Sequence, residues 1–178
     1  MKKNIAVLSI LIMLVGIAVY QNIQTKQEQV SVAAEEMPKP DYRVPSFTLA
    51  SLTGEEFKVG GERDKPLMIN FWASWCGPCE KEAPDLVKLY QAYEGQFDLY
   101  AVNITQGDSM RNVRAFVDRH QFQFPVLLDK DGKISEKFRV IAIPTSFIVD
   151  KKGVIRDVFY SETYNSLNKK IKAVLDDK

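Results

Sequence analysis

Residues 70–79 read Asn-Phe-Trp-Ala-Ser-Trp-Cys-Gly-Pro-Cys, and the patterns on either side of them differ. Upstream, residues 67–72 form an apolar run interrupted only by Asn70, which is the pattern of a central strand buried on both faces. Downstream, apolar residues recur every three or four positions, which predicts a helix with one buried face. Its apolar positions are Ala83, Leu86, Val87, Tyr90 and Tyr93. The two cysteines therefore stand where a buried strand gives way to a helix.

The elements around this junction indicate an α/β fold with a mixed central sheet flanked by helices. Further strands are predicted at residues 47–49, 56–59, 97–104, 125–128, 146–149 and 154–159. Further helices are predicted at residues 109–120 and 133–138, and along the stripe of Leu167, Ile171, Val174 and Leu175. The turn at residues 150–153 ends in Gly153, which favours a hairpin between the last two strands.

Size and charge narrow the functional classes. The chain has 178 residues, enough for one ordinary domain and an appendage, and 46% of its residues are hydrophobic, enough for a core. Lys and Arg total 24 against 23 Asp and Glu, and the two signs alternate along the chain. Nucleic-acid binders cluster positive charge, so nucleic acid is not an expected partner.

The N-terminal segment is predicted to be a membrane anchor. Lys2 and Lys3 precede an apolar run over residues 5–20, and no further charge occurs before Lys26. The run is shorter than the roughly 20 residues that usually cross a bilayer, but residues 21–23 can extend the helix into the headgroup region. A cleaved signal peptide is the alternative, although the bulky Tyr20 suits cleavage poorly.

We therefore expect residues 1–23 to be an uncleaved signal-anchor that crosses a bacterial cell membrane once as a transmembrane helix. The positive-inside bias of the two lysines places the rest of the chain on the extracytoplasmic side. Residues 24–40 are polar and read as a linker, and residues 41–178 are expected to form the folded domain.

The spacing of Cys76 and Cys79 predicts a reversible disulfide, because one helical turn brings the two side chains together. Cys76 falls at the helix N-terminus, where backbone N–H groups and the helix dipole stabilise a thiolate. We expect it to be the nucleophile. Pro78 suits the first turn, where its missing N–H costs little. Cys79 is expected to attack the mixed disulfide and release the product.

Other uses of such a pair fit the sequence less well. Structural zinc needs four ligands, and the chain offers two cysteines and the single His120. Covalent haem attachment needs His directly after Cys79, where Glu80 stands. A merely structural disulfide remains open, yet closing so small a loop restrains the unfolded chain little. No metal or cofactor is therefore predicted, and His120 is predicted to be a surface histidine without a function.

Residues 70–79, together with Ile143-Pro144-Thr145, resemble the thioredoxin superfamily. Glu82, Pro84 and an inserted helix-strand element before Ile143 resemble its TlpA/ResA-like membrane-anchored branch, and the similarity covers about residues 38–178. The resemblance implies that Pro144 is cis and lies against the disulfide, and that Ile143 offers backbone hydrogen bonds to a substrate. It also implies that Trp75, Gly77, Pro78, Ile143, Pro144 and Thr145 support the site.

One departure from thioredoxin concerns the proton of the second cysteine. Thioredoxin has a buried Asp where this chain has Asn70. The branch resemblance gives the role of assisting proton transfer to Glu82, which lies three residues after Cys79 on the same side of the helix. The implied catalytic residues are thus Cys76, Cys79 and Glu82. A solvated surface Glu82 is the alternative.

The direction of electron flow is predicted from the Gly77-Pro78 dipeptide, which is thioredoxin's own. Thioredoxin is reducing, at about −270 mV against about −120 mV for the oxidant DsbA. The resemblance therefore implies a monomeric protein-disulfide reductase that receives electrons from a membrane donor of the CcdA type. Its implied clients are exported proteins, such as apocytochrome c in cytochrome c biogenesis or spore-envelope proteins. A copper metallochaperone and a thiol peroxidase are the alternatives.

Overall fold

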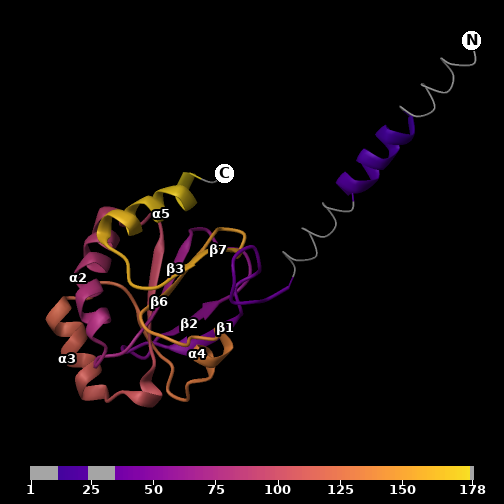
Figure 1. Ribbon diagram of the computed structural model, residues 1–178. Coiled ribbons are helices and arrows are strands. Elements are labelled where there is room, and N and C mark those ends of the chain that lie inside the picture. Colours follow the sequence, from indigo (N-terminus) through magenta and orange to yellow (C-terminus); the bar gives the residue numbers. More distant parts are fainter. Residues whose placement is uncertain (1–11, 24–34, 177–178) are drawn as a thin grey trace, which may run out of the picture. The chain divides into compact units, whose positions relative to one another are not determined.

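The computed structural model describes residues 12–23 and 35–176, in two units that divide at Glu35 (Figure 1). Residues 12–23 form a helix. Within the two described ranges, no helix is both long enough and apolar enough to cross a membrane. The predicted anchor also includes residues 1–11 and the predicted linker includes residues 24–34, and both of these segments lie outside the described residues. The anchor therefore stays a prediction.

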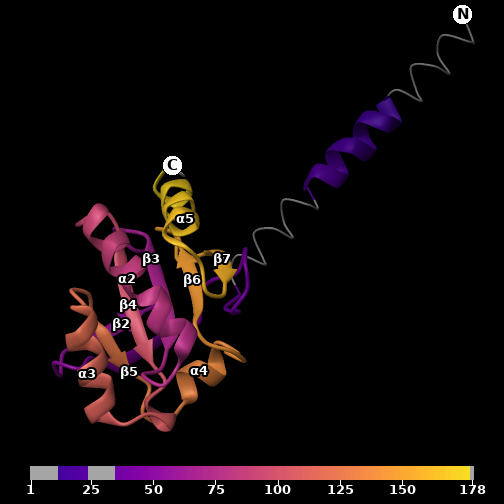
Figure 2. The ribbon, with the colours of Figure 1, turned by 60° about the vertical axis from the view of Figure 1, so that its left-hand side comes forward.

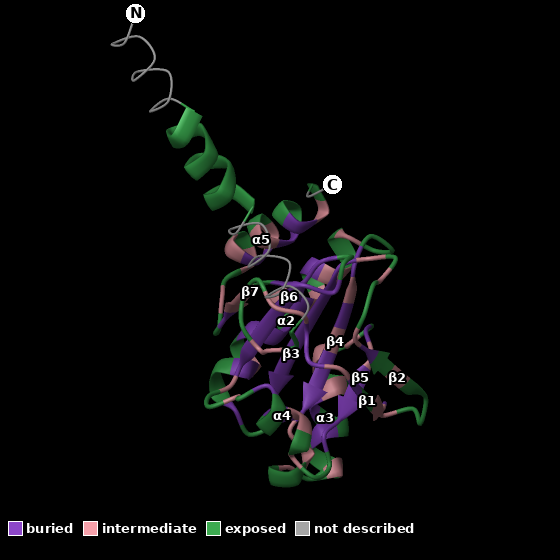
Figure 3. Ribbon diagram, turned by 90° about the vertical axis from the view of Figure 1, so that its right-hand side faces the viewer, coloured by how far each residue is buried: buried purple, intermediate pink, exposed green. Residues whose placement is uncertain are grey.

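The second unit is built on a five-stranded mixed sheet of order β5-β4-β3-β6-β7. The strands are β3 (Leu67–Trp72), β4 (Asp98–Asn103), β5 (Val126–Leu128), β6 (Thr145–Val149) and β7 (Ile155–Phe159). β3, β4 and β5 are parallel, whereas β6 runs antiparallel to both β3 and β7. Every residue of β3 is buried, which confirms it as the central strand (Figure 3).

Helices cover one face of this sheet. They are α2 (Gly77–Ala92), α3 (Met110–His120) and α5 (Tyr164–Asp176), and the core on that face contains buried residues of all three (Figures 1 and 2). Trp72 sits there with its ring 4.5 Å from that of Phe116. In α2 the buried stripe differs from the prediction, because Leu89 is fully buried while Val87 and Tyr90 are only half-buried.

The other face is covered by a hairpin and a short helix. The hairpin pairs β1 (Phe47–Ala50) antiparallel with β2 (Glu56–Val59), as predicted, and the short helix is α4 (Lys133–Lys137). Phe71 of β3 packs there against Phe138 and Phe147. Burying each such ring stabilises the fold by roughly 1.5–3 kcal/mol.

The folded unit begins at Glu36, inside the segment that the sequence assigns to the linker. The Glu36 carboxylate accepts hydrogen bonds from the backbone N–H and the hydroxyl of Ser46, at 3.0 and 3.1 Å. The Met37 N–H donates to the Arg43 carbonyl at 3.0 Å. These contacts hold the start of the folded unit against the segment that leads into β1.

The sheet topology determines where the cysteines meet the rest of the chain. β3 ends at Trp72, and its antiparallel neighbour β6 begins at Thr145, with Phe71 opposite Thr145 in the register. The segment after β3 and the segment before β6 therefore emerge at the same edge of the sheet. The parallel strand β4 ends there too, with Asn103 opposite Trp72. Three chain segments thus converge on the cysteine pair.

Candidate active site

A disulfide joins Cys76 and Cys79 at the N-terminus of α2, with their Cα atoms 5.2 Å apart. Cys76 is the N-cap residue, and its sulfur accepts a hydrogen bond from the Cys79 N–H at 3.1 Å. Pro78 occupies the first turn, as predicted. This N–H would stabilise a Cys76 thiolate in the reduced protein, because a sulfur anion at a helix N-terminus gains both hydrogen bonding and the dipole.

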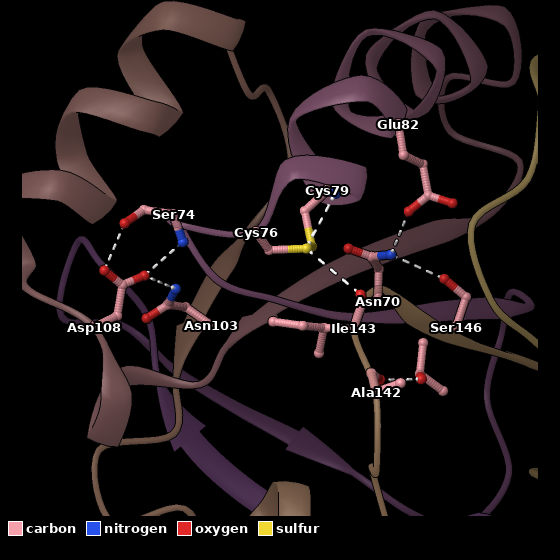
Figure 4. The surroundings of a disulfide bond; sticks show 11 residues. Asn70, Ser74, Cys76, Cys79, Glu82, Asn103, Asp108, Ala142, Ile143 and Ser146 are labelled. Carbon is pink, nitrogen blue, oxygen red and sulfur yellow. Dashed lines mark hydrogen bonds between the residues drawn. A yellow bond between two sulfur atoms is a disulfide. The ribbon is translucent and has the colours of Figure 1, made fainter.

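The segment before β6 faces the disulfide. The Ile143–Pro144 peptide bond is cis, which confirms the prediction, and Pro144 is buried. Cys76 Sγ lies 3.5 Å from the Ile143 carbonyl oxygen (Figure 4). The Thr145 hydroxyl donates to the Ala142 carbonyl at 2.6 Å and so ties the turn that carries Pro144. The structure therefore brings Ile143 to Cys76, with Pro144 and Thr145 directly after it in the same turn.

Glu82 is buried, with only 2% of its surface exposed, so the alternative of a solvated surface residue is wrong. One carboxyl oxygen accepts the Glu162 N–H at 3.0 Å and the other accepts the Asn70 side-chain amide at 3.1 Å. Burial raises the pKa of Glu82 to about 7. The hydrogen bonds from Glu162 and Asn70 lower this pKa, while the charges of Asp85 and Glu162 raise it further.

Asn70 connects Glu82 to the centre of the sheet. Its amide nitrogen donates to the Glu82 carboxyl and, at 2.9 Å, to the Ser146 hydroxyl. In Figure 4 the Asn70 amide is drawn between the disulfide and Glu82. Asn70 cannot titrate, whereas the Glu82 carboxyl that it contacts can. Glu82 and Cys79 lie one helical turn apart in α2, both buried.

A second carboxylate, which the sequence did not indicate, holds the turn before Cys76. Asp108 accepts hydrogen bonds from the Ser74 N–H at 2.6 Å and the Ser74 hydroxyl at 2.5 Å. It also accepts from the Asn103 amide at 3.0 Å and the Ser109 N–H at 2.8 Å. Burial alone would raise the pKa of Asp108, but these hydrogen bonds lower it below its ordinary value. Because Ser74 is 34 residues away, no local sequence signal identifies the contact.

The expectation of a surface His120 is also wrong. The side chain of His120 is only 11% exposed, and its ring packs 4.5 Å from that of Phe116. Its Nε2 atom lies 2.9 Å from a carboxyl oxygen of Glu80, the residue that follows Cys79. The pKa of Glu80 is lowered, first by the hydrogen bond from Arg119 and then by His120. The aromatic residues against His120 are near neighbours in the sequence, Phe116 and Phe122, whereas Glu80 is 40 residues away, so only the contact with Glu80 lies beyond what local spacing shows.

Comparisons with known proteins agree with this geometry. The AhpC/TSA family model matches residues 40–158. The chain is 38% identical over 150 residues to the thioredoxin-like protein YneN of Bacillus subtilis, across 84% of this chain and 85% of that protein. It is 33% identical over 181 residues to the thiol-disulfide oxidoreductase ResA of Bacillus thuringiensis subsp. konkukian, across 98% and 99% of the two chains.

The solved structures include a similar fold. The crystal structure of StoA from Bacillus subtilis superposes with a TM-score of 0.63 at 28% identity, covering 70% of this chain and 95% of StoA. Similarity along nearly the full length of ResA carries the assignment of activity, and the chain contains a Cys76–Cys79 redox pair of the kind that thiol-disulfide exchange requires. The chain therefore belongs to the AhpC/TSA family and is a thioredoxin-like thiol-disulfide oxidoreductase of the ResA and StoA type.

Proposed function

We propose that this oxidoreductase is a membrane-anchored reductase that acts on disulfides in exported proteins, with apocytochrome c as a candidate client. The observation that carries the proposal is the disulfide at the N-terminus of α2 with a buried acid of pKa about 7 one turn further on. The Gly77-Pro78 dipeptide supports the reducing direction, because the same dipeptide serves in thioredoxin. A membrane dithiol donor of the CcdA type would return the pair to its reduced form.

The reaction follows from the placement of the two sulfurs. The Cys76 thiolate attacks one sulfur of the client disulfide, that disulfide bond breaks, and the other client sulfur leaves as a thiolate. Cys79 then gives its proton to Glu82 as its sulfur attacks Cys76 Sγ, and the second client sulfur leaves. Two electrons pass to the client, and the chain ends with the Cys76–Cys79 disulfide of the structure.

Glu82 suits the second step because its pKa lies near neutral pH. A carboxyl with an ordinary pKa would be a weak proton acceptor for a thiol, since the ideal base has a pKa close to the working pH. Burial supplies this shift, and the Asn70 amide keeps the carboxyl oriented. At neutral pH a substantial fraction of Glu82 is therefore ionised and able to accept the proton.

The test is a trap for the mixed disulfide. Cys79→Ala removes the resolving sulfur, so we expect this variant to accumulate higher-mass mixed disulfides that a reductant cleaves. Their partner is expected to be an exported cysteine protein, which mass spectrometry would identify. Cys76→Ala is the matched control, because it keeps one cysteine but loses the thiolate at the helix N-terminus, and we expect far fewer adducts. Absence of adducts in Cys79→Ala, while the wild type turns over, would contradict Cys76 as the nucleophile.

The same variants test the first alternative, and a comparison of substrates tests the second. A copper metallochaperone binds the metal through both sulfurs, so the two substitutions would damage it to a similar degree. A thiol peroxidase would consume hydrogen peroxide at a rate that exceeds its reduction of a protein disulfide. We expect neither result, because Cys76 alone is the helix N-cap with a sulfur that accepts the Cys79 N–H, which supports unequal roles for the two sulfurs.

A further inference from the structure

The loop between β4 and α3, residues 104–109, touches the turn that carries the nucleophile. The Ile104 N–H donates to the Trp72 carbonyl at 3.0 Å, and the Trp75 indole N–H donates to the Gly107 carbonyl at 2.8 Å. Between these two contacts, the Asp108 carboxylate accepts hydrogen bonds from both the N–H and the hydroxyl of Ser74. The loop therefore binds the chain just before Cys76 at three successive points.

Asp108 is itself held rigidly. One of its oxygens accepts the Ser74 N–H and the Asn103 amide, and the other accepts the Ser74 hydroxyl and the Ser109 N–H. Hydrogen bonds to an ionised carboxylate are short and strong, so four of them fix its position. Asn103 is fully buried at the end of β4. A continuous chain of contacts thus runs from the sheet through Asn103 and Asp108 to Ser74.

Asp108 binds the turn at residues 73–76, which also carries Trp75. The Cys76 N–H donates to the Ala73 carbonyl at 3.2 Å, which places Ser74 and Trp75 at the centre of the turn (Figure 4 shows Ser74 and Asp108). Trp75 is 64% exposed although its indole N–H is tied to Gly107. A tethered, exposed ring has already lost much of its freedom, so contact with a ligand costs it little further entropy.

We propose that Asp108 is a positioning residue for protein substrates: by gripping Ser74 it presents the Trp75 ring beside Cys76 as a preorganised contact for a client polypeptide. The inference rests on the proposed reduction of protein disulfides. A small disulfide reaches Cys76 without needing the ring, whereas a polypeptide must dock against the surface around it. Asp108 therefore affects selectivity between the two kinds of substrate rather than the chemistry at sulfur.

Asp108→Asn tests this role. The new amide keeps one acceptor oxygen, and its NH2 group meets a backbone N–H donor in either orientation, that of Ser74 or that of Ser109. The substitution therefore weakens the hold on the turn while keeping the size of the side chain. We expect kcat/KM for the disulfides of insulin to fall about tenfold, mainly through KM, and the rate with oxidised glutathione to change less than about twofold. Asp118→Asn, at an exposed position on α3, is the matched control and should leave both rates unchanged.

A double-mutant cycle with Trp75→Phe tests whether Asp108 acts through the ring. If it does, the losses on insulin should fall well short of additive, because both substitutions disable the same contact. Ser74→Ala, which removes one donor only, replaces Asp108→Asn if that variant does not fold. Equal losses on both substrates, no loss on insulin, or additive losses would overturn the inference alone. A wild type that reduces oxidised glutathione but not insulin would overturn the proposed function, and the inference with it.

Discussion

Glu82 and Asp108 are two carboxylates with opposite electrostatic environments. Both accept hydrogen bonds, yet the pKa of Glu82 rises to about 7 while that of Asp108 falls below its ordinary value. The difference lies in burial and in the number of donors, since Glu82 is almost fully enclosed with two donors and Asp108 is half-buried with four. Glu82 is suited to exchange a proton near neutral pH, and Asp108 is suited to remain ionised and hold the turn at Ser74.

Glu82 should make the stability of the oxidised protein depend on pH. Its folded pKa of about 7 lies above the ordinary pKa of 4.5, so between these values the folded state holds a proton that the unfolded state has lost. The free energy of unfolding therefore falls as pH rises through this window and is constant above it. A difference of about 2.5 units corresponds to about 3 kcal/mol. Glu82→Gln should remove this fall, as measured by urea unfolding at pH 4 and pH 8.

Glu80→Gln is the matched control on the same helix. The pKa of Glu80 is lowered, so ionisation of Glu80 makes the free energy of unfolding rise with pH instead of fall. This contribution is small at so exposed a position. Glu82→Gln should also slow disulfide exchange and remove any inflection near pH 7 from the rate profile. A variant whose unfolding free energy follows the pH dependence of the wild type would show that Glu82 ionises normally in the fold.

At the level of elements, local patterns predicted most strands and helices but not the contacts between distant loops. The apolar run of β3 and the periodicity of α2 are visible within a few residues, and both elements are confirmed. The burial of Glu82 depends on Glu162, which lies 80 residues away, and the role of Asp108 depends on Ser74. No local periodicity encodes such pairings, so the sequence indicated Glu82 only through family resemblance.

The β6–β7 turn offers a test of an element's backbone. Gly153 has φ of +77°, and an added methyl group there would overlap the carbonyl oxygen of Gly61. Gly54, in the β1–β2 hairpin, has φ of +92° with open space around it. Gly54→Ala should therefore cost only the backbone strain, about 1–2 kcal/mol. Gly153→Ala should cost about 2–4 kcal/mol, because the overlap adds to the strain.

Thermal unfolding of the two glycine variants beside the wild type would measure this difference. The comparison isolates the overlap with Gly61, since both positions share the left-handed conformation. Equal losses of stability would mean that the segment around Gly61 moves aside at little cost. The β6–β7 hairpin would then hold the edge of the sheet less firmly than the contacts at Gly153 indicate.

On the scale of the whole molecule, the folded unit concentrates its chemistry at one edge of the sheet. The ends of β3 and β4 and the start of β6 meet there, and they bring together the cysteines, Asn103 and Pro144. The alternation of strands and helices along the chain indicates an α/β fold, which is why the fold class was predictable. The remaining large-scale question is where the protein resides, and it concerns the N-terminal segment.

The last prediction is that the full-length chain is an integral membrane protein with its folded unit outside the cytoplasm. Lys2 and Lys3 followed by the apolar run over residues 5–20 favour this topology. The full-length mass should remain in the membrane fraction after alkaline extraction, and external protease should digest the folded unit in intact spheroplasts. Leu14→Lys should weaken membrane insertion, because a charge near the middle of a spanning helix costs about 2.5–3.5 kcal/mol. Lys26→Leu, outside the run, is the matched control, and a shortened soluble protein beginning after Tyr20 would instead establish cleavage.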